Sequence, residues 1–115
     1  MNRPTMPLQD IFNTVYKGLR EQGFKKSLNG SACAYRGADG SKCAVGFLIA
    51  DWEYSAVMEG LWFLPLNDSY DLGFSSEQAR FIVKLQFDHD DSHGSQNMRL
   101  RLEQTARDHN LSIPE

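Results

Sequence analysis

The densest group of metal-binding and acid–base side chains in this sequence is the run 88–93, Asp-His-Asp-Asp-Ser-His. Carboxylates and imidazoles are the groups that bind divalent metal ions and transfer protons in enzymes. If a helix continued through the run, His89 and His93 would share one face, and a metal site would consist of His89, Asp90 and His93. Charge runs usually face water, so a solvated turn that caps the neighbouring helices is the first interpretation. A protein-binding surface and a metal or acid–base site are the alternatives.

The two cysteines, Cys33 and Cys43, lie ten residues apart on either side of a turn. Free cysteines usually behave as small buried hydrophobic residues, and we predict this for both. Two sulfurs are too few for a structural zinc site. If Cys43 began a helix, the helix dipole would favour its thiolate, and Cys43 would act as a nucleophile with His89 and Asp90. Whether the two cysteines pair stays open.

Aromatic rings and carboxylates alternate in the middle of the chain, between residues 51 and 63. Clefts with such walls bind sugars, bases and cationic side chains, and exposed apolar patches often mark protein-binding surfaces. Packing of these rings in the core is the alternative. The candidate binding residues are Tyr35, Arg36, Asp51, Trp52, Glu53, Tyr54, Glu59 and Trp62.

Composition favours one folded domain over residues 1–115, because 41% of the residues are hydrophobic and 23% are charged. The net charge of -3 argues against a broad nucleic-acid surface, and the basic group Lys17, Arg20, Lys25 and Lys26 is interrupted by Glu21. No glycine-rich phosphate loop is present, so we expect no cofactor. The longest apolar run, 61–66, is far shorter than the roughly 20 residues of a membrane span, which predicts a cytoplasmic protein.

Three helices must position these groups. The first is expected from about residue 7 to 22, where apolar residues recur at three- and four-residue spacing and Gly23 follows as a cap. A second begins after Ser75, which forms a capping box with Gln78, and ends near residue 88. One stripe of this helix consists of Ala79, Ile82, Val83 and Gln86, and another of Phe81, Leu85 and Asp88. The helix is therefore apolar over much of its circumference and is expected to be central. The third is expected from about residue 96 to 109.

Between the first and second of these helices, the sequence shows turn signals and no long helical pattern. Turn signals at 29–30 and 37–40 bracket a short strand at 31–36, which predicts a small meander over 24–40. Residues 42–49 are expected to form a short helix. Residues 51–74 are expected to be irregular, with one helical turn near 55–59, because Pro65 and the cluster at 67–69 interrupt any long element. The predicted fold class is α+β, with three to four helices packed around a small antiparallel β-meander in a single domain.

One block of the chain resembles a family. It reads Cys33-x-Tyr-Arg-Gly-x-Asp-Gly-x-x-Cys-Ala-Val-Gly-x-Leu-Ile49, followed by Met58-Glu-Gly60 and Leu85-Gln-x-x-His-Asp90. This pattern is similar to that of small uncharacterised intracellular proteins of bacteria and tailed phages. The resemblance implies a small stand-alone protein and supplies no substrate or cofactor. Either the block is structural, with His89 tying its helix to the meander, or Tyr35, Arg36, Cys43, His89 and Asp90 converge on a cleft. The structural interpretation requires fewer coincidences.

We therefore expect a non-enzymatic accessory protein of phage or bacterial origin that binds and modulates a host protein. Its binding surface would lie between Asp51 and Tyr70. One alternative is a small metal-dependent or Cys/His-based enzyme that uses Cys43, His89 and Asp90, and another is a module that binds a nucleotide or other small ligand. We expect no membrane or nucleic-acid partner, and the oligomeric state stays open.

Overall fold

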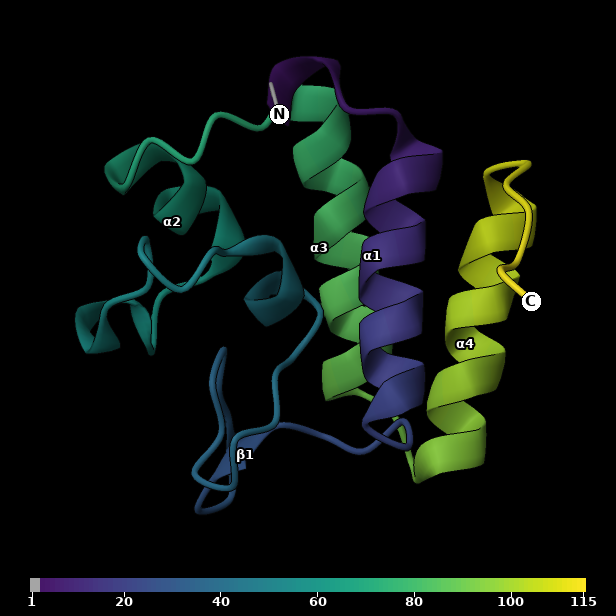
Figure 1. Ribbon diagram of the computed structural model, residues 1–115, viewed down its shortest axis with the longest axis horizontal. Coiled ribbons are helices and arrows are strands. Elements are labelled where there is room, and N and C mark those ends of the chain that lie inside the picture. The colour runs from purple at the N-terminus through teal and green to yellow at the C-terminus, as the bar shows by residue number, and fades with distance from the viewer. Residues whose placement is uncertain (1–2) are drawn as a thin grey trace.

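Three long helices lie side by side in the computed structural model, which describes residues 3–115 (Figure 1). They are α1 (Leu8–Glu21), α3 (Ser76–Asp90) and α4 (Ser95–Asp108). Each of the three contacts the other two, and α3 also contacts α2, so α3 is the central helix. The middle of the chain, residues 28–74, which includes α2 (Phe63–Ser69), lies to the left of the three helices in Figure 1.

The predicted ends of the long helices are confirmed. Gly23 has a φ of +78°, and the N–H of Phe24 donates to the carbonyl of Leu19 at 2.7 Å, which closes α1 with a Schellman motif. Ser75 and Gln78 form the capping box that begins α3. Asn110, with a φ of +58°, ends α4 in the same way as Gly23 ends α1.

The β-structure is smaller than predicted. Strands β1 (Leu28–Asn29) and β2 (Ala32–Cys33) form a two-stranded antiparallel hairpin in which Leu28 pairs with Cys33. The predicted strand over 31–36 ends at Cys33, and beyond it only an isolated bridge joins Arg36 to Lys42. The α+β class is confirmed, with four α-helices and one small antiparallel sheet within residues 3–115.

The fourth α-helix is not the one that the sequence predicted. Residues 42–49 contain a one-turn 3-10 helix, Val45–Leu48, whereas the region expected to be irregular contains α2. Pro65 is the third residue of α2, where a backbone N–H has no partner within a helix, so proline does not interrupt it. The predicted helical turn near 55–59 is present as the 3-10 helix Ala56–Met58. A third 3-10 helix, Arg3–Thr5, precedes α1.

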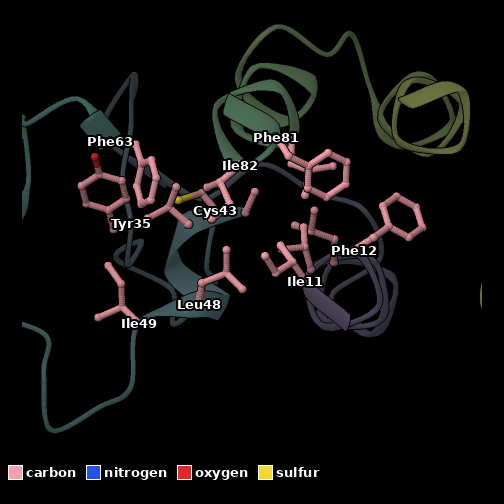
Figure 2. Close-up of a cluster of buried hydrophobic side chains, with 14 of the residues drawn as sticks. Ile11, Phe12, Tyr35, Cys43, Leu48, Ile49, Phe63, Phe81 and Ile82 are labelled. Atoms are coloured by element: carbon pink, nitrogen blue, oxygen red, sulfur yellow. The ribbon is translucent and has the colours of Figure 1, made fainter. Parts of the chain in front are cut away.

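The core contains buried residues of α1, α3, α4 and the segment 43–49, and Figure 2 shows the part between α1, α3 and that segment. Ile11 and Phe12 of α1 and Ile82 of α3 are fully buried there, or nearly so, and Cys43 lies among them. Tyr35 and Phe63 extend the cluster toward α2. The core thus fixes α2 and the hairpin relative to α3. No helix within residues 3–115 is long and apolar enough to cross a membrane.

Candidate functional site

Cys33, His89 and Asp90 meet where the hairpin approaches the last turn of α3. The Cys33 sulfur, a ring nitrogen of His89 and a carboxylate oxygen of Asp90 all lie within 4.8 Å of one another. No other group of three potential metal ligands is this close together in residues 3–115. His93, which the predicted metal site included, is exposed on the loop before α4 and is not in this group.

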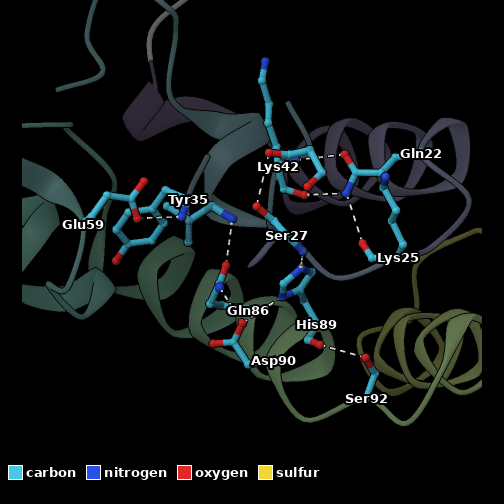
Figure 3. A network of polar contacts seen from close by, with 12 residues as sticks. Gln22, Lys25, Ser27, Tyr35, Lys42, Glu59, Gln86, His89, Asp90 and Ser92 are labelled. Carbon is cyan, nitrogen blue, oxygen red and sulfur yellow. Dashed lines mark hydrogen bonds and ion pairs between the residues drawn. The ribbon is translucent and has the colours of Figure 1, made fainter. Parts of the chain in front are cut away.

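Both ring nitrogens of His89 are used in hydrogen bonds within the protein (Figure 3). Nε2 accepts from the backbone N–H of Ser27 at 2.9 Å, so the ring proton is on Nδ1, which donates to Oδ1 of Asp90 at 2.8 Å. The side chain is fully buried. His89 therefore ties α3 to the chain just before the hairpin, as the structural interpretation of the sequence block predicts.

These hydrogen bonds do not suit a metal site. A metal ion on Nδ1 would displace the proton, while Nε2 continued to accept from Ser27, so the ring would have to become an imidazolate anion. Without His89, the cluster supplies only the Cys33 sulfur and the Asp90 carboxylate. Two ligands are fewer than the three or four that zinc sites use.

The two cysteines occupy different environments. Cys33 is exposed, which corrects the prediction that it is buried, whereas Cys43 is fully buried as predicted. Partial desolvation, the charge of Asp90 and a hydrogen bond to it raise the pKa of Cys33 to about 11, against a weaker opposite effect of Lys26. Burial raises the pKa of Cys43 to about 12. Both sulfurs are thus protonated at neutral pH, and neither is an activated nucleophile.

Asp90 is held by neutral donors alone. Its Oδ1 accepts from Nδ1 of His89 and from Nε2 of Gln86, the latter at 2.9 Å. Gln86 is fixed in turn, because its Oε1 accepts from the N–H of Val45 at 2.9 Å. The ion pairs of residues 3–115 include no lysine or arginine on Asp90, and its side chain is 41% exposed.

Two adjoining cavities border Asp90. The inner one, of about 210 Å³, lies between β2 and the start of α2, and the outer one, of about 460 Å³, lies between α2 and α3. Both are lined by Trp62, Phe63, Gln86 and Asp90. We call the outer cavity the α2–α3 groove, and its lining residues are Trp62, Phe63, Leu64, Pro65, Val83, Gln86, Phe87, Asp90 and Asp91.

The rim of the groove is apolar and faces solvent. Trp62 is 84% exposed, Phe87 is 56% exposed and Leu64 is 53% exposed. Val83, which the sequence placed in an apolar stripe of its helix together with Ile82, is also exposed. Large apolar side chains that are this exposed and this close together are typical of binding surfaces.

Several predicted binding residues instead hold the loops together. The carboxylate of Glu59 accepts from the backbone N–H groups of Tyr35 and Arg36, at 2.9 and 3.1 Å, and from the hydroxyl of Tyr54 at 2.6 Å. Arg36 lies over the ring of Tyr54, 4.6 Å from its centre, and pairs with Asp51 at 2.7 Å. These contacts use the same side chains that a binding site would need free.

The predicted binding residues lie in different parts of the structure. Trp62, Tyr35 and Glu59 line the inner cavity, whereas Glu53 pairs with Arg3 and holds the N-terminal 3-10 helix. Trp52 is 86% exposed but lines neither cavity. The structure therefore separates the two tryptophans that the sequence placed in one surface.

Sequence reasoning missed the second wall of the groove. Val83 and Phe87 lie one turn apart on α3, and Asp90 and Asp91 follow one turn later. This spacing puts a second apolar face on a helix whose buried face is already supplied by Ile82 and Leu85. That second face was the available signal, but the predicted stripes of this helix group Val83 with the buried Ile82 and do not include Phe87.

Comparisons with protein-family models, curated proteins and solved structures found no match to this chain. The features that bear on function are therefore the groove and the polar cluster beside it. The groove offers a preformed apolar surface, and the cluster offers a fixed carboxylate rather than a reactive group.

Proposed function

We propose that this chain is a non-enzymatic accessory protein, of bacterial or phage origin, that binds a segment of a host protein in the α2–α3 groove and thereby modulates it. The observation that carries the proposal is the set of exposed apolar side chains around the groove, with Trp62 and Phe87 on opposite walls. Interface cores are enriched in aromatic residues, and tryptophan is the residue type most enriched among those that dominate binding energy.

The groove is also preorganised. Phe63 is buried at its base and packs against Phe74, with ring centres 5.9 Å apart. α3 forms the other wall and is anchored in the core by its buried face. A surface that is already in place costs little conformational entropy when a partner binds.

The chemistry of the polar cluster supports binding over catalysis. An enzyme that used Cys33 or Cys43 would need a thiolate, and the raised pKa of each thiol opposes this. A general base needs a free lone pair, and both ring nitrogens of His89 are in hydrogen bonds within the protein. What the cluster does supply is an oriented negative charge.

The two exposed tryptophans provide a matched test. Immobilised protein is used to capture partners from a lysate of the cells that naturally contain it, in wild-type, Trp62→Ala, Phe87→Ala and Trp52→Ala forms. We expect one protein to be retained in stoichiometric amount by the wild type and by Trp52→Ala, and lost by Trp62→Ala and Phe87→Ala. Capture that depends on Trp52 but not on Trp62, or no capture at all, would contradict the proposal.

A further inference from the structure

We propose that the α2–α3 groove selects a partner segment in which an arginine lies beside apolar residues, and that Asp90 binds the arginine. This inference rests on the proposed function and names the chemistry of the partner. Three observations support it: the charge of the groove, the fixed orientation of Asp90, and the aromatic rings beside Asp90.

The two cavities carry negative charge without positive charge. Their lining residues include the three carboxylates of Glu59, Asp90 and Asp91 and no lysine or arginine. Glu59 is occupied by three donors within the protein, and Asp91 has Nη1 of Arg101 at 3.7 Å. Asp90 has only neutral donors, so it is the carboxylate whose charge remains to be matched by a partner.

Asp90 is oriented before any partner arrives. His89 and Gln86 both bind Oδ1, and each is itself fixed by a backbone N–H, of Ser27 and Val45 respectively. Because these bonds hold the carboxylate in one position, a cation that binds it does not have to order the side chain. The 41% exposure of the side chain keeps it within reach of such a cation.

The aromatic residues beside Asp90 favour arginine over lysine. Trp62, Phe63 and Phe87 line the same cavity as Asp90. A guanidinium group is planar and stacks on aromatic faces while its N–H groups donate to a neighbouring carboxylate, whereas an ammonium group stacks on such faces less well. The remaining wall, formed by Leu64, Pro65 and Val83, is apolar and fits the residues next to the arginine.

The open rim favours a polypeptide over a small molecule. Sites for small molecules usually enclose most of the ligand surface. Here Trp62, Leu64 and Phe87 project into solvent at the edge of the groove, where only a ligand that extends beyond the cavity would cover them. A chain segment with apolar residues on both sides of the arginine would do so.

The test uses a display library of random peptides about 12 residues long, a length that spans a typical peptide-binding groove. Selection on the wild-type protein is compared with selection on Trp62→Ala. We expect peptides that require Trp62, and among them an enrichment of arginine beside aromatic or aliphatic residues. Peptides that require Trp62 but lack this enrichment would overturn the inference and leave the proposed function intact. A library that yields no peptide requiring Trp62 would overturn both.

The best selected peptide then tests Asp90 directly. Its affinity is measured by calorimetry with the arginine present or replaced by lysine or citrulline, against wild type, Asp90→Asn and Asp68→Asn. Asp68 is an exposed carboxylate of α2 outside both cavities, so its variant matches the change in net charge. We expect Asp90→Asn to weaken binding of the arginine peptide about tenfold or more, and of the citrulline peptide much less.

Other results of these measurements would overturn individual parts of the inference. Equal loss of affinity for the arginine and citrulline peptides in Asp90→Asn would overturn the assignment of Asp90, as would an equal effect of Asp68→Asn. Tighter binding of the lysine peptide would overturn the preference for arginine. A small guanidinium compound, phenethylguanidine, is measured in parallel, and binding as tight as that of the peptide would overturn the choice of a polypeptide.

Discussion

The position of one proton on His89 determines what the polar cluster can do. Because Nε2 accepts from Ser27, the proton lies on Nδ1 and points at Asp90. The same residue types with the opposite tautomer would present a free ring nitrogen to a metal or a substrate. In this structure the imidazole orients a carboxylate, and the carboxylate is the group that faces solvent.

The Cys33 thiol reports on the charge of Asp90. Asp90→Asn removes a negative charge and a hydrogen bond that raise the pKa of Cys33, so we expect that pKa to fall below about 11. Desolvation is the larger cause and remains, so the fall is partial. Each unit by which the pKa of Cys33 falls raises the fraction of thiolate at neutral pH about tenfold.

The measurement is the rate of iodoacetamide alkylation of Cys33 near neutral pH, followed by mass spectrometry. We expect the rate to increase in Asp90→Asn and to stay near the wild-type value in Asp68→Asn. Cys43 is fully buried and should not react in the folded protein, so it serves as an internal reference. An unchanged or slower rate in Asp90→Asn would show that Asp90 does not act on the thiol.

His89→Ala should destabilise the protein through the groups that it leaves behind. The buried N–H of Ser27 would lose its acceptor, and a cavity would remain in place of the ring. We expect a loss of about 2–4 kcal/mol in the free energy of unfolding, measured in urea. His93→Ala removes an exposed imidazole four residues away and should change it by less than about 0.5 kcal/mol. Similar losses in the two variants would contradict a structural role for His89.

The two apolar faces of α3 have different uses. One face, with Phe81, Ile82 and Leu85, is buried against the neighbouring helices and the core. The other, with Val83 and Phe87, forms a wall of the groove. A helix that is apolar on most of its circumference is usually central, and α3 is central to the fold. It nevertheless retains an uncovered apolar face.

Two phenylalanines of α3, one on each apolar face, test which face stabilises the fold. Phe81 is 3% exposed, so Phe81→Ala should cost about 3–5 kcal/mol in the free energy of unfolding, as expected for a large cavity. Phe87→Ala should cost less than about 1 kcal/mol, because that ring is already more than half exposed. Urea unfolding of both variants checks this. A large loss for Phe87→Ala would show that the ring serves stability rather than binding.

Long-range polar contacts of Arg3 hold the N-terminal 3-10 helix against the loops before and after α2. Arg3 Nη1 donates to Glu53 at 2.6 Å, across 50 residues of sequence, and also to the carbonyl of Leu72 at 3.0 Å. A single side chain thus joins the start of the chain to the two loops on either side of α2. The hydrogen bonds from Arg3 lower the pKa of Glu53, against a smaller opposing effect of burial.

This contact predicts a pH dependence of stability. Because the pKa of Glu53 is lower in the folded than in the unfolded protein, its contribution is present above the ordinary value of 4.5 and is lost as the pH falls below it. We expect Glu53→Gln to be less stable than wild type at pH 7, and the difference to shrink as the pH falls below 4.5 toward the lower pKa of the folded state. Urea titrations at a series of pH values measure it, with Asp68→Asn as the control. A difference that is constant with pH would contradict the assignment.

Most of the helical fold was predictable, because its signals are local. The capping box at Ser75, the cap at Gly23 and the periodic apolar residues of α1 each act within a few residues. Helix α2 was missed because proline was interpreted as a helix breaker. Its position in the first turn, where proline is tolerated, is set by the burial of Phe63 and Leu66 against the core.

The candidate site was predictable only in part. The sequence identified His89, Asp90 and Trp62 as residues of interest, but it grouped His89 with His93 and Trp62 with Trp52. Partners for a side chain come from segments far apart in the chain, such as Ser27, which is 62 residues from His89. No local pattern encodes that distance.

The sequence by itself determined the three long helices, their ends and the α+β class, since helix periodicity and capping depend on neighbouring residues. Only the tertiary structure decided that Cys33 faces solvent beside Asp90 while Cys43 is sealed in the core. It also decided that Val83 and Phe87 face a groove rather than the interior. The physical reason is that each apolar face is buried only if another element is free to cover it, and α3 has more apolar faces than its neighbours cover.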